Sequence, residues 1–341
     1  MGQSSTDLGI HELELMHHYQ AMVCSTLSGQ PPVQQTWQSV IPKEATSHPG
    51  LMHALLALAA LHRSHFDSCR SSHYRNAAMR HQNLSLPYLR SLLNNASTEN
   101  CNALFALSAT IVVFVFALPQ SQIAPMEFDP FKEMITIIEL VKGLSAVAEI
   151  TRDWILRGPL RPLLLPGRWG VSLAIPEDIG DALNCLLLRN NTLMQSDSKR
   201  ATYNTAIGML RKTFEMLTLN PADHGVSLFW AAVIERHYID LLKAEEPMAL
   251  VLLAHFGVAL HASRKNWWSG NWGCQLVKVV YEMLEDHWRP WIQWPIIRVG
   301  LSSVSPLTVP CVLRSYISQD LPELPIDQID FPQYDQTMMR C

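Results

Sequence analysis

The sequence has few charged residues and no surplus of basic ones. Aspartate, glutamate, lysine and arginine make up 16% of its 341 residues, and the formal net charge is −4. Typical globular domains carry about 25% charged residues, and proteins that bind nucleic acids present a basic face to the phosphate backbone. We therefore expect no direct nucleic-acid binding by this chain.

The seven cysteines form no local pattern. They are scattered from Cys24 to Cys341, odd in number, and never spaced as C-x-x-C, which argues against a disulfide framework and against a local zinc site. Among the 14 histidines, His62 and His65 have no third ligand at a fixed spacing, and no H-E-x-x-H motif occurs. We predict reduced thiols, no metal and no cofactor.

Long apolar runs are also lacking. The longest, Ala103–Leu118, has 16 residues and includes Ser108 and Thr110, whereas a membrane-spanning helix needs about 18 or more. The opening residues do not show the charged and then apolar layout of a secretory signal. The sequence therefore predicts a buried core helix, no membrane span, and an intracellular protein of the nucleus or the cytoplasm.

Alternating β-branched runs are nearly absent, while apolar residues recur at helical spacing almost everywhere. We predict an all-α fold, a multi-helix bundle of antiparallel helix pairs. Residues 1–300 form one helical regulatory or ligand-binding domain, and residues 301–341 form a proline-containing tail packed on it. The 48% of hydrophobic residues is enough for a large core and suggests a wide cavity or a partner surface as well.

Proline and glycine set the expected element boundaries. A loop is predicted after Gly29, until a helix begins at Pro49 and continues to about His65. A second periodic segment, from Ser71 to about Leu93, pairs with this helix and is interrupted near Pro87. Later helix starts are expected at Pro176–Glu177, Asn220–Pro221 and Pro247, the last directly after a single helix that runs from Ser227 to Glu246.

Six of the ten tryptophans lie close together near the end of the sequence, beginning with NWWSGNW. They can plug one end of a helix bundle, or they can line a pocket for a rigid apolar ligand. Gly270 and Gly273 provide the positive φ or close backbone approach that such a loop needs. The predicted ligand-binding residues are His255, Phe256, Trp267, Trp268, Trp272, Met283, Trp288, Trp291 and Trp294.

Catalytic motifs are missing from the sequence. No G-x-S-x-G elbow, P-loop or dinucleotide-binding glycine pattern occurs. The acidic groups at Asp178 and Asp181, at Glu245 and Glu246, and near Glu282 do not form the metal-binding motifs of a terpene cyclase, and we interpret them as capping or solvated residues. The catalytic residues of any enzyme activity are therefore unknown.

Several segments together resemble a known family. LELMHHY, SHPGLMHALLALAALHRSH, ITRDWILRGPLRPLL and, above all, ALVLLAHFGVALHASRKNWWSGNWGCQLVKVVYEMLEDHWRPWIQWP are similar to the carboxyl-terminal regulatory domain of fungal zinc-cluster transcription factors of the sterol-uptake-control type. The resemblance covers roughly residues 8–300. It implies an all-helical regulatory body that holds a sterol among its carboxyl-terminal helices.

Members of this family also carry an amino-terminal cluster in which six cysteines hold two zinc ions and bind DNA. No C-x₂-C-x₆-C arrangement precedes Leu8, so either this chain is one piece of a longer protein or the protein has lost its DNA-binding part. The resemblance therefore implies a transcriptional regulator-like domain without DNA binding of its own.

Three functions remain open at this point. The first is a regulatory domain that senses a hydrophobic, sterol- or terpenoid-like molecule, or docks a partner such as a DNA-binding regulator or a second copy of itself. The second is a fungal biosynthetic enzyme, a cyclase or pericyclase of secondary metabolism, that reuses the apolar pocket to position a terpenoid or polyketide intermediate. The third is a pure interaction protein that inhibits a full-length relative.

Overall fold

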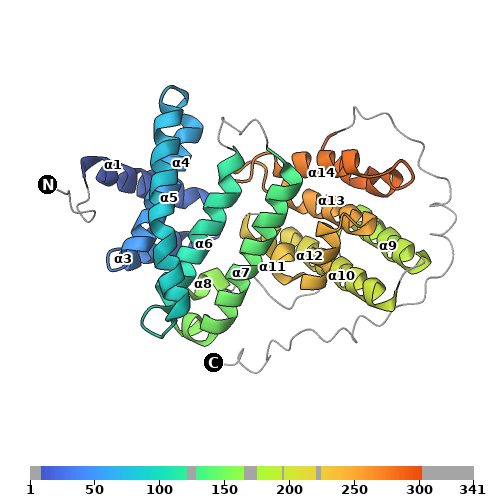
Figure 1. The fold of residues 1–341 in the computed structure, drawn as a ribbon, viewed down its shortest axis with the longest axis horizontal. Coiled ribbons are helices and arrows are strands. Elements are labelled where there is room, and N and C mark those ends of the chain that lie inside the picture. Colours follow the sequence, from blue (N-terminus) through green and yellow to red (C-terminus); the bar gives the residue numbers. More distant parts are fainter. Residues whose placement is uncertain (1–8, 121–127, 165–174, 194–195, 220–223, 302–341) are drawn as a thin grey trace. The chain divides into compact units, whose positions relative to one another are not determined.

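The computed structural model describes residues 9–120, 128–164, 175–193, 196–219 and 224–301, all within one compact unit, Met1–Ser305. The predicted all-α fold is confirmed, since no strand occurs among these residues (Figure 1). The first helices are α1 (Ile10–His18), α2 (Pro31–Gln35), α3 (Ile41–Ala45), α4 (Pro49–Phe66), α5 (Ser71–Asn94), α6 (Cys101–Ala117), α7 (Pro130–Arg157) and α8 (Arg161–Leu164). The remaining ones are α9 (Glu177–Thr192), α10 (Asp197–Leu219), α11 (Phe229–Val233), α12 (Arg236–Lys243), α13 (Pro247–His261), α14 (Trp272–Met283) and α15 (Gln293–Arg298).

Helices α4 and α5 form the predicted hairpin and pack along each other (Figure 1). Pro49 stands in the first turn of α4, where its missing N–H costs nothing. Every residue from Ala54 to Leu61 is buried, because α1, α3, α5 and α6 all contact α4. This helix is therefore central to the amino-terminal part of the unit.

The predicted interruption of the second hairpin helix near Pro87 is wrong. Helix α5 continues through Pro87 to Asn94, although an interior proline removes a hydrogen bond and costs about 3 kcal/mol. The helix buries Tyr74, Ala78 and Ser85, and its extensive packing against α4 offsets that cost.

The predicted loop after Gly29 is also wrong. Helix α2, a π-helical turn over Thr36–Val40 and α3 occupy this segment. Pro31 and Pro42 lie in first turns of helices and do not break them. Trp37, Ile41 and Ala45 are buried at a spacing of four residues, which is the helical pattern that the prolines obscured.

Helix α6 is the predicted core helix. The segment Cys101–Gln120 is long and apolar enough to cross a membrane, yet 72% of its most apolar 18-residue window is buried inside the protein. The hydroxyls of Ser108 and Thr110 donate hydrogen bonds to carbonyls four residues earlier. The helix packs against α4 and α7, which is the environment of a buried helix in a protein core.

The segment from Ser227 to Glu246, predicted as one helix, is divided into α11 and α12 at Ile234 and Glu235. In a continuous helix the carbonyl of Ala232 would accept a hydrogen bond from the N–H of Arg236. It instead accepts one from Nζ of Lys142 on α7, at 3.1 Å. A tertiary interaction therefore competes with the local one at this break.

Helices α13 and α14 form a second close pair, and α15 packs on α13. The predicted starts of α9 near Pro176 and of α13 at Pro247 are confirmed. The predicted helix start at Asn220–Pro221 lies outside the described residues, as does the tail from residue 302 onward.

Candidate functional site

The tryptophan loop, residues 266–271 between α13 and α14, turns its indoles into the protein. Trp267, Trp268 and the adjoining Trp272 are at most 7% exposed. The N–H of Trp267 donates to Oγ1 of Thr26 at 2.8 Å, and that of Trp268 donates to the carbonyl of Thr26 at 3.2 Å. The N–H of Trp272 donates to the carbonyl of Phe116 at 2.8 Å. These three indoles are packed and hydrogen-bonded within the protein.

Two glycines allow this packing, as predicted. Gly270 has φ +43°, and a Cβ there would lie 2.3 Å from Oε1 of Gln120, the atom that accepts a hydrogen bond from the N–H of Asn271. A Cβ at Gly273 would lie 2.5 Å from the carbonyl oxygen of Gly257. The turn and the close contact of α13 with α14 both require the absence of a side chain.

Three further tryptophans lie in or next to the last helical elements: Trp288 precedes the 3-10 turn Arg289–Ile292, Trp291 lies within it, and Trp294 lies in α15. The Arg189 guanidinium of α9 lies 4.5 Å from the ring centroid of Trp288 and 5.0 Å from that of Trp291. Trp294 stacks on His255 at 5.5 Å, and its N–H donates to Asp178 at 3.2 Å. The two sets of indoles therefore have different partners in the protein.

The other predicted residues are also divided. Phe256 is fully buried and packs on Trp230 with ring centroids 4.7 Å apart, whereas His255 stacks on Trp294. Met283, the last residue of α14, is partly buried against the core. That these nine residues bind a ligand remains a prediction.

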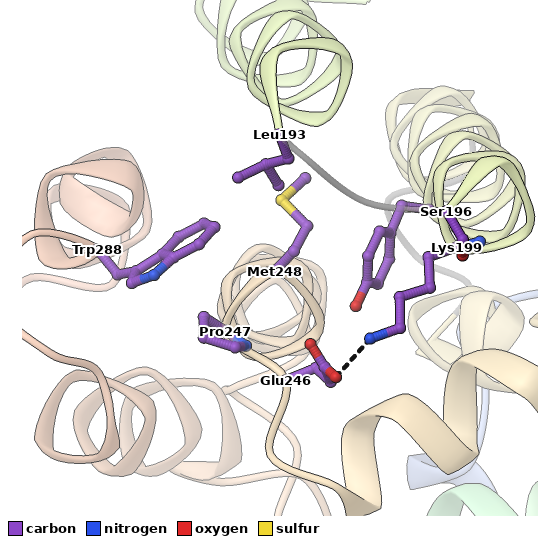
Figure 2. A pocket seen from close by; sticks show the side chains of 8 residues that line it. Leu193, Ser196, Lys199, Glu246, Pro247, Met248 and Trp288 are labelled. Carbon is purple, nitrogen blue, oxygen red and sulfur yellow. Dashed lines mark hydrogen bonds and ion pairs between the residues drawn. The ribbon is translucent and has the colours of Figure 1, made fainter.

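A cleft opens where Trp288 approaches α10 and the start of α13. Its volume is about 280 Å³, slightly below the ~300–1,000 Å³ of sites for drug-sized ligands. Of the predicted residues, Trp288 lines it. The lining consists of Leu193, Ser196, Lys199, Tyr203, Glu246, Pro247, Met248 and Trp288 (Figure 2).

The cleft has an apolar side and a polar side. Figure 2 shows Leu193, Met248 and Trp288 on one side, and Lys199 facing Glu246 on the other. Nζ of Lys199 lies 2.6 Å from Oε1 of Glu246. Sequence reasoning missed all of these residues except Trp288, because they come from segments that are adjacent only in the folded chain.

Tyr203 supplies a buried hydroxyl to the polar side. The residue is 1% exposed, and its hydroxyl has no hydrogen-bond partner among the described residues. Burial raises the pKa of this hydroxyl, and the negative charge of Glu246 raises the pKa further. Tyr203 therefore stays protonated and can donate a hydrogen bond to a molecule in the cleft.

Four of the histidines lie in two close pairs. His18 and His62 approach at 2.9 Å between ring nitrogens, and His53 and His81 approach at 3.1 Å. Burial lowers the pKa of His62 to about 3, with a further contribution from His18. Within the described ranges, no three His, Cys, Asp or Glu side chains are placed to hold a metal ion.

Part of the sequence matches a known protein family. Residues 14–122 match the model of the fungal specific transcription factor domain. The predicted resemblance is confirmed. In the family this is a regulatory region that does not itself bind DNA.

Three known proteins are similar to the chain over longer stretches than residues 14–122. The chain is 26% identical to a Zn(2)-C6 fungal-type transcription factor of Gibberella zeae over 84% of its length and 61% of the relative's. It is 36% identical to sterol uptake control protein 2 of Candida albicans over 52% of its length and 23% of the relative's. It is 24% identical to the Zn(2)-C6 fungal-type transcription factor afumD of Aspergillus fumigatus over 74% of its length and 68% of the relative's. The chain thus spans less than two thirds of the first two relatives.

Proposed function

We propose that this chain is the regulatory body of a nuclear transcriptional regulator and that it responds to a hydrophobic, sterol- or terpenoid-like molecule. Promoter contact belongs to a DNA-binding partner or to another part of a longer protein. The fungal specific transcription factor domain supports the regulatory role. The name of one relative, sterol uptake control protein 2, supports the class of ligand.

The cleft beside Trp288 is the observation that carries the ligand proposal. It joins the end of α9 and the start of α10, at Leu193, Lys199 and Tyr203, to a distant part of the sequence at Trp288. A molecule bound there contacts both parts and favours the packing in which they are close together. The molecule changes the balance between this packing and an alternative one only to the extent that it binds this packing more tightly.

A reporter assay tests this function. The full 341-residue chain is fused to an unrelated DNA-binding module in yeast, and reporter output is followed with cholesterol, farnesol or abietic acid. We expect at least one compound to change the output by about fivefold or more, the range of ordinary allosteric coupling. If none of the three changes it, the proposal fails.

Two variants separate ligand sensing from folding. Leu193→Glu places a charge at the half-exposed apolar side of the cleft and should abolish the response at unchanged protein level. Trp288→Ala should do the same, whereas Trp37→Ala, which removes an equally buried indole elsewhere, should retain it. A response that survives both cleft variants would place the ligand elsewhere and overturn the assignment of this cleft.

A further inference from the structure

The polar side of the cleft offers hydrogen-bond donors to a bound molecule. The buried hydroxyl of Tyr203 has no acceptor among the described residues, and an unpaired buried donor is costly. Nζ of Lys199 uses one of its three N–H groups on Glu246. A ligand that supplies acceptor atoms at this point satisfies the hydroxyl and the remaining ammonium donors together.

The charged lining of the cleft consists of one cation and one carboxylate. Lys199 is balanced by Glu246. Arg189, stacked on the ring of Trp288, has a buried Nε without a hydrogen-bond partner in the described part of the chain. The Arg189 guanidinium adds a second cation beside Trp288, and the hydrogen-bond donors of Lys199 and Tyr203 favour an anionic head over a cationic one.

The opposite side of the cleft suits an apolar body. Leu193, Met248 and Trp288 present aliphatic, thioether and aromatic surface. The volume of about 280 Å³ is slightly below the ~300–1,000 Å³ of sites for drug-sized ligands. The cleft therefore takes a small molecule whole, or one end of a larger one.

We propose that the cleft binds an apolar carboxylic acid in its ionised form. The carboxylate accepts hydrogen bonds from Lys199 and Tyr203, and the apolar body packs on Trp288 and Met248. This inference rests on the proposed function, because it names the chemical class of the ligand for the same cleft: an acid, such as a terpenoid acid or a fatty acid.

Three probes that share the same apolar chain and differ in their head group test the chemical class of the ligand. Octanoate, octan-1-ol and octylammonium are titrated into the full chain by isothermal calorimetry. We expect octanoate to bind about tenfold or more tightly than octan-1-ol, as a charge-assisted hydrogen bond provides, and octylammonium to bind most weakly. Equal affinity for octanoate and octan-1-ol would overturn the proposal.

Variants assign the preference to named groups. Lys199→Met should remove the preference for octanoate while octan-1-ol binds as before, and Tyr203→Phe should weaken both. The double variant Lys199→Met/Glu246→Gln keeps the net charge and should behave like Lys199→Met. Lys243→Met is the matched control, because Lys243 forms a similar half-exposed ion pair with Glu139 outside the cleft, and it should keep the preference.

The calorimetric and reporter experiments can fail separately. If octanoate binds with the expected preference but no compound alters the reporter, the carboxylate site stands and the proposed function fails. If a compound alters the reporter through the cleft but octanoate shows no preference, the function stands and the carboxylate assignment fails. Retention of the preference in Lys199→Met also overturns the assignment.

Discussion

At the scale of single residues, Gly270 determines how the tryptophan loop turns. Its φ of +43° lies in the left-handed region, and its missing Cβ leaves room for the Gln120 carboxamide. Gln120 Oε1 then accepts the hydrogen bond from the N–H of Asn271. One small residue therefore positions the chain immediately before α14.

Replacing Gly270 with alanine should destabilise the protein. Left-handed φ in a residue with a Cβ costs about 1–3 kcal/mol, and the clash with Gln120 adds to that cost. Gly143→Ala in α7 is the control, since nothing lies within 4 Å of a Cβ at that position and it should stabilise the helix by about 0.5–1 kcal/mol. Urea unfolding measures both, and an equal effect of the two substitutions would contradict this account.

At the scale of elements, Thr26 connects the amino-terminal segment to the tryptophan loop. Its Oγ1 donates to the carbonyl of Val23 and accepts from the Trp267 indole, and its own carbonyl accepts from Trp268. This residue follows the first helical segment and contacts a loop near the carboxyl-terminal end of the described unit. The two segments therefore stabilise each other.

Thr26→Val should cost about 1–3 kcal/mol, because it leaves the buried Trp267 N–H without an acceptor. Thr46→Val is the matched control. Thr46 makes the same kind of local bond, from its hydroxyl to the carbonyl of Lys43, but at an exposed position, so a change below about 0.5 kcal/mol is expected. A shift in the thermal midpoint for both variants alike would mean that the indole bond contributes nothing.

The sequence predicts helix boundaries correctly where the local preferences of the residues agree with the packing of the folded protein. The starts of α4 and α13 follow from proline at a first helical position. The continuation of α5 through Pro87 and the break between α11 and α12 could not be predicted, because packing against α4 and the Lys142 hydrogen bond decide them. Those contacts come from elsewhere in the chain.

The candidate site shows the same division. The sequence predicts that the tryptophan block either plugs the bundle or lines a pocket, and Trp267, Trp268, Trp272 and Trp288 are buried. The cleft, however, pairs Lys199 with Glu246 across 47 positions of sequence, and neither residue belongs to a recognisable motif. Trp288 is the point at which the sequence prediction and the cleft coincide.

At the scale of the whole molecule, buried histidines make stability depend on pH. Burial lowers the pKa of His18, His81 and His255 from 6.5 to about 4. Nearby arginines lower the pKa further at His18 and His81. A folded-state pKa below the unfolded one means that the unfolded chain binds more protons in this window. The free energy of unfolding is therefore highest above about pH 6.5 and decreases as the pH falls toward about 4.

The thermal midpoint should therefore fall as the pH is lowered from neutral to about 5. His255→Phe keeps an aromatic ring against Trp294 but removes one buried imidazole. The thermal midpoint of this variant should therefore depend less on pH. His287→Phe changes an exposed histidine and should leave the dependence as it is. A midpoint that is constant over this range would contradict the burial of neutral imidazoles.

The hydrogen bonds between Thr26 and the two indoles join positions 241 and 242 residues apart. During synthesis on the ribosome, the amino-terminal helices emerge long before their partners in the tryptophan loop exist. Their native contacts cannot be completed until the chain past Trp268 has left the exit tunnel. A nascent chain stopped short of that point has to wait, or be held by a chaperone, with its packing unfinished.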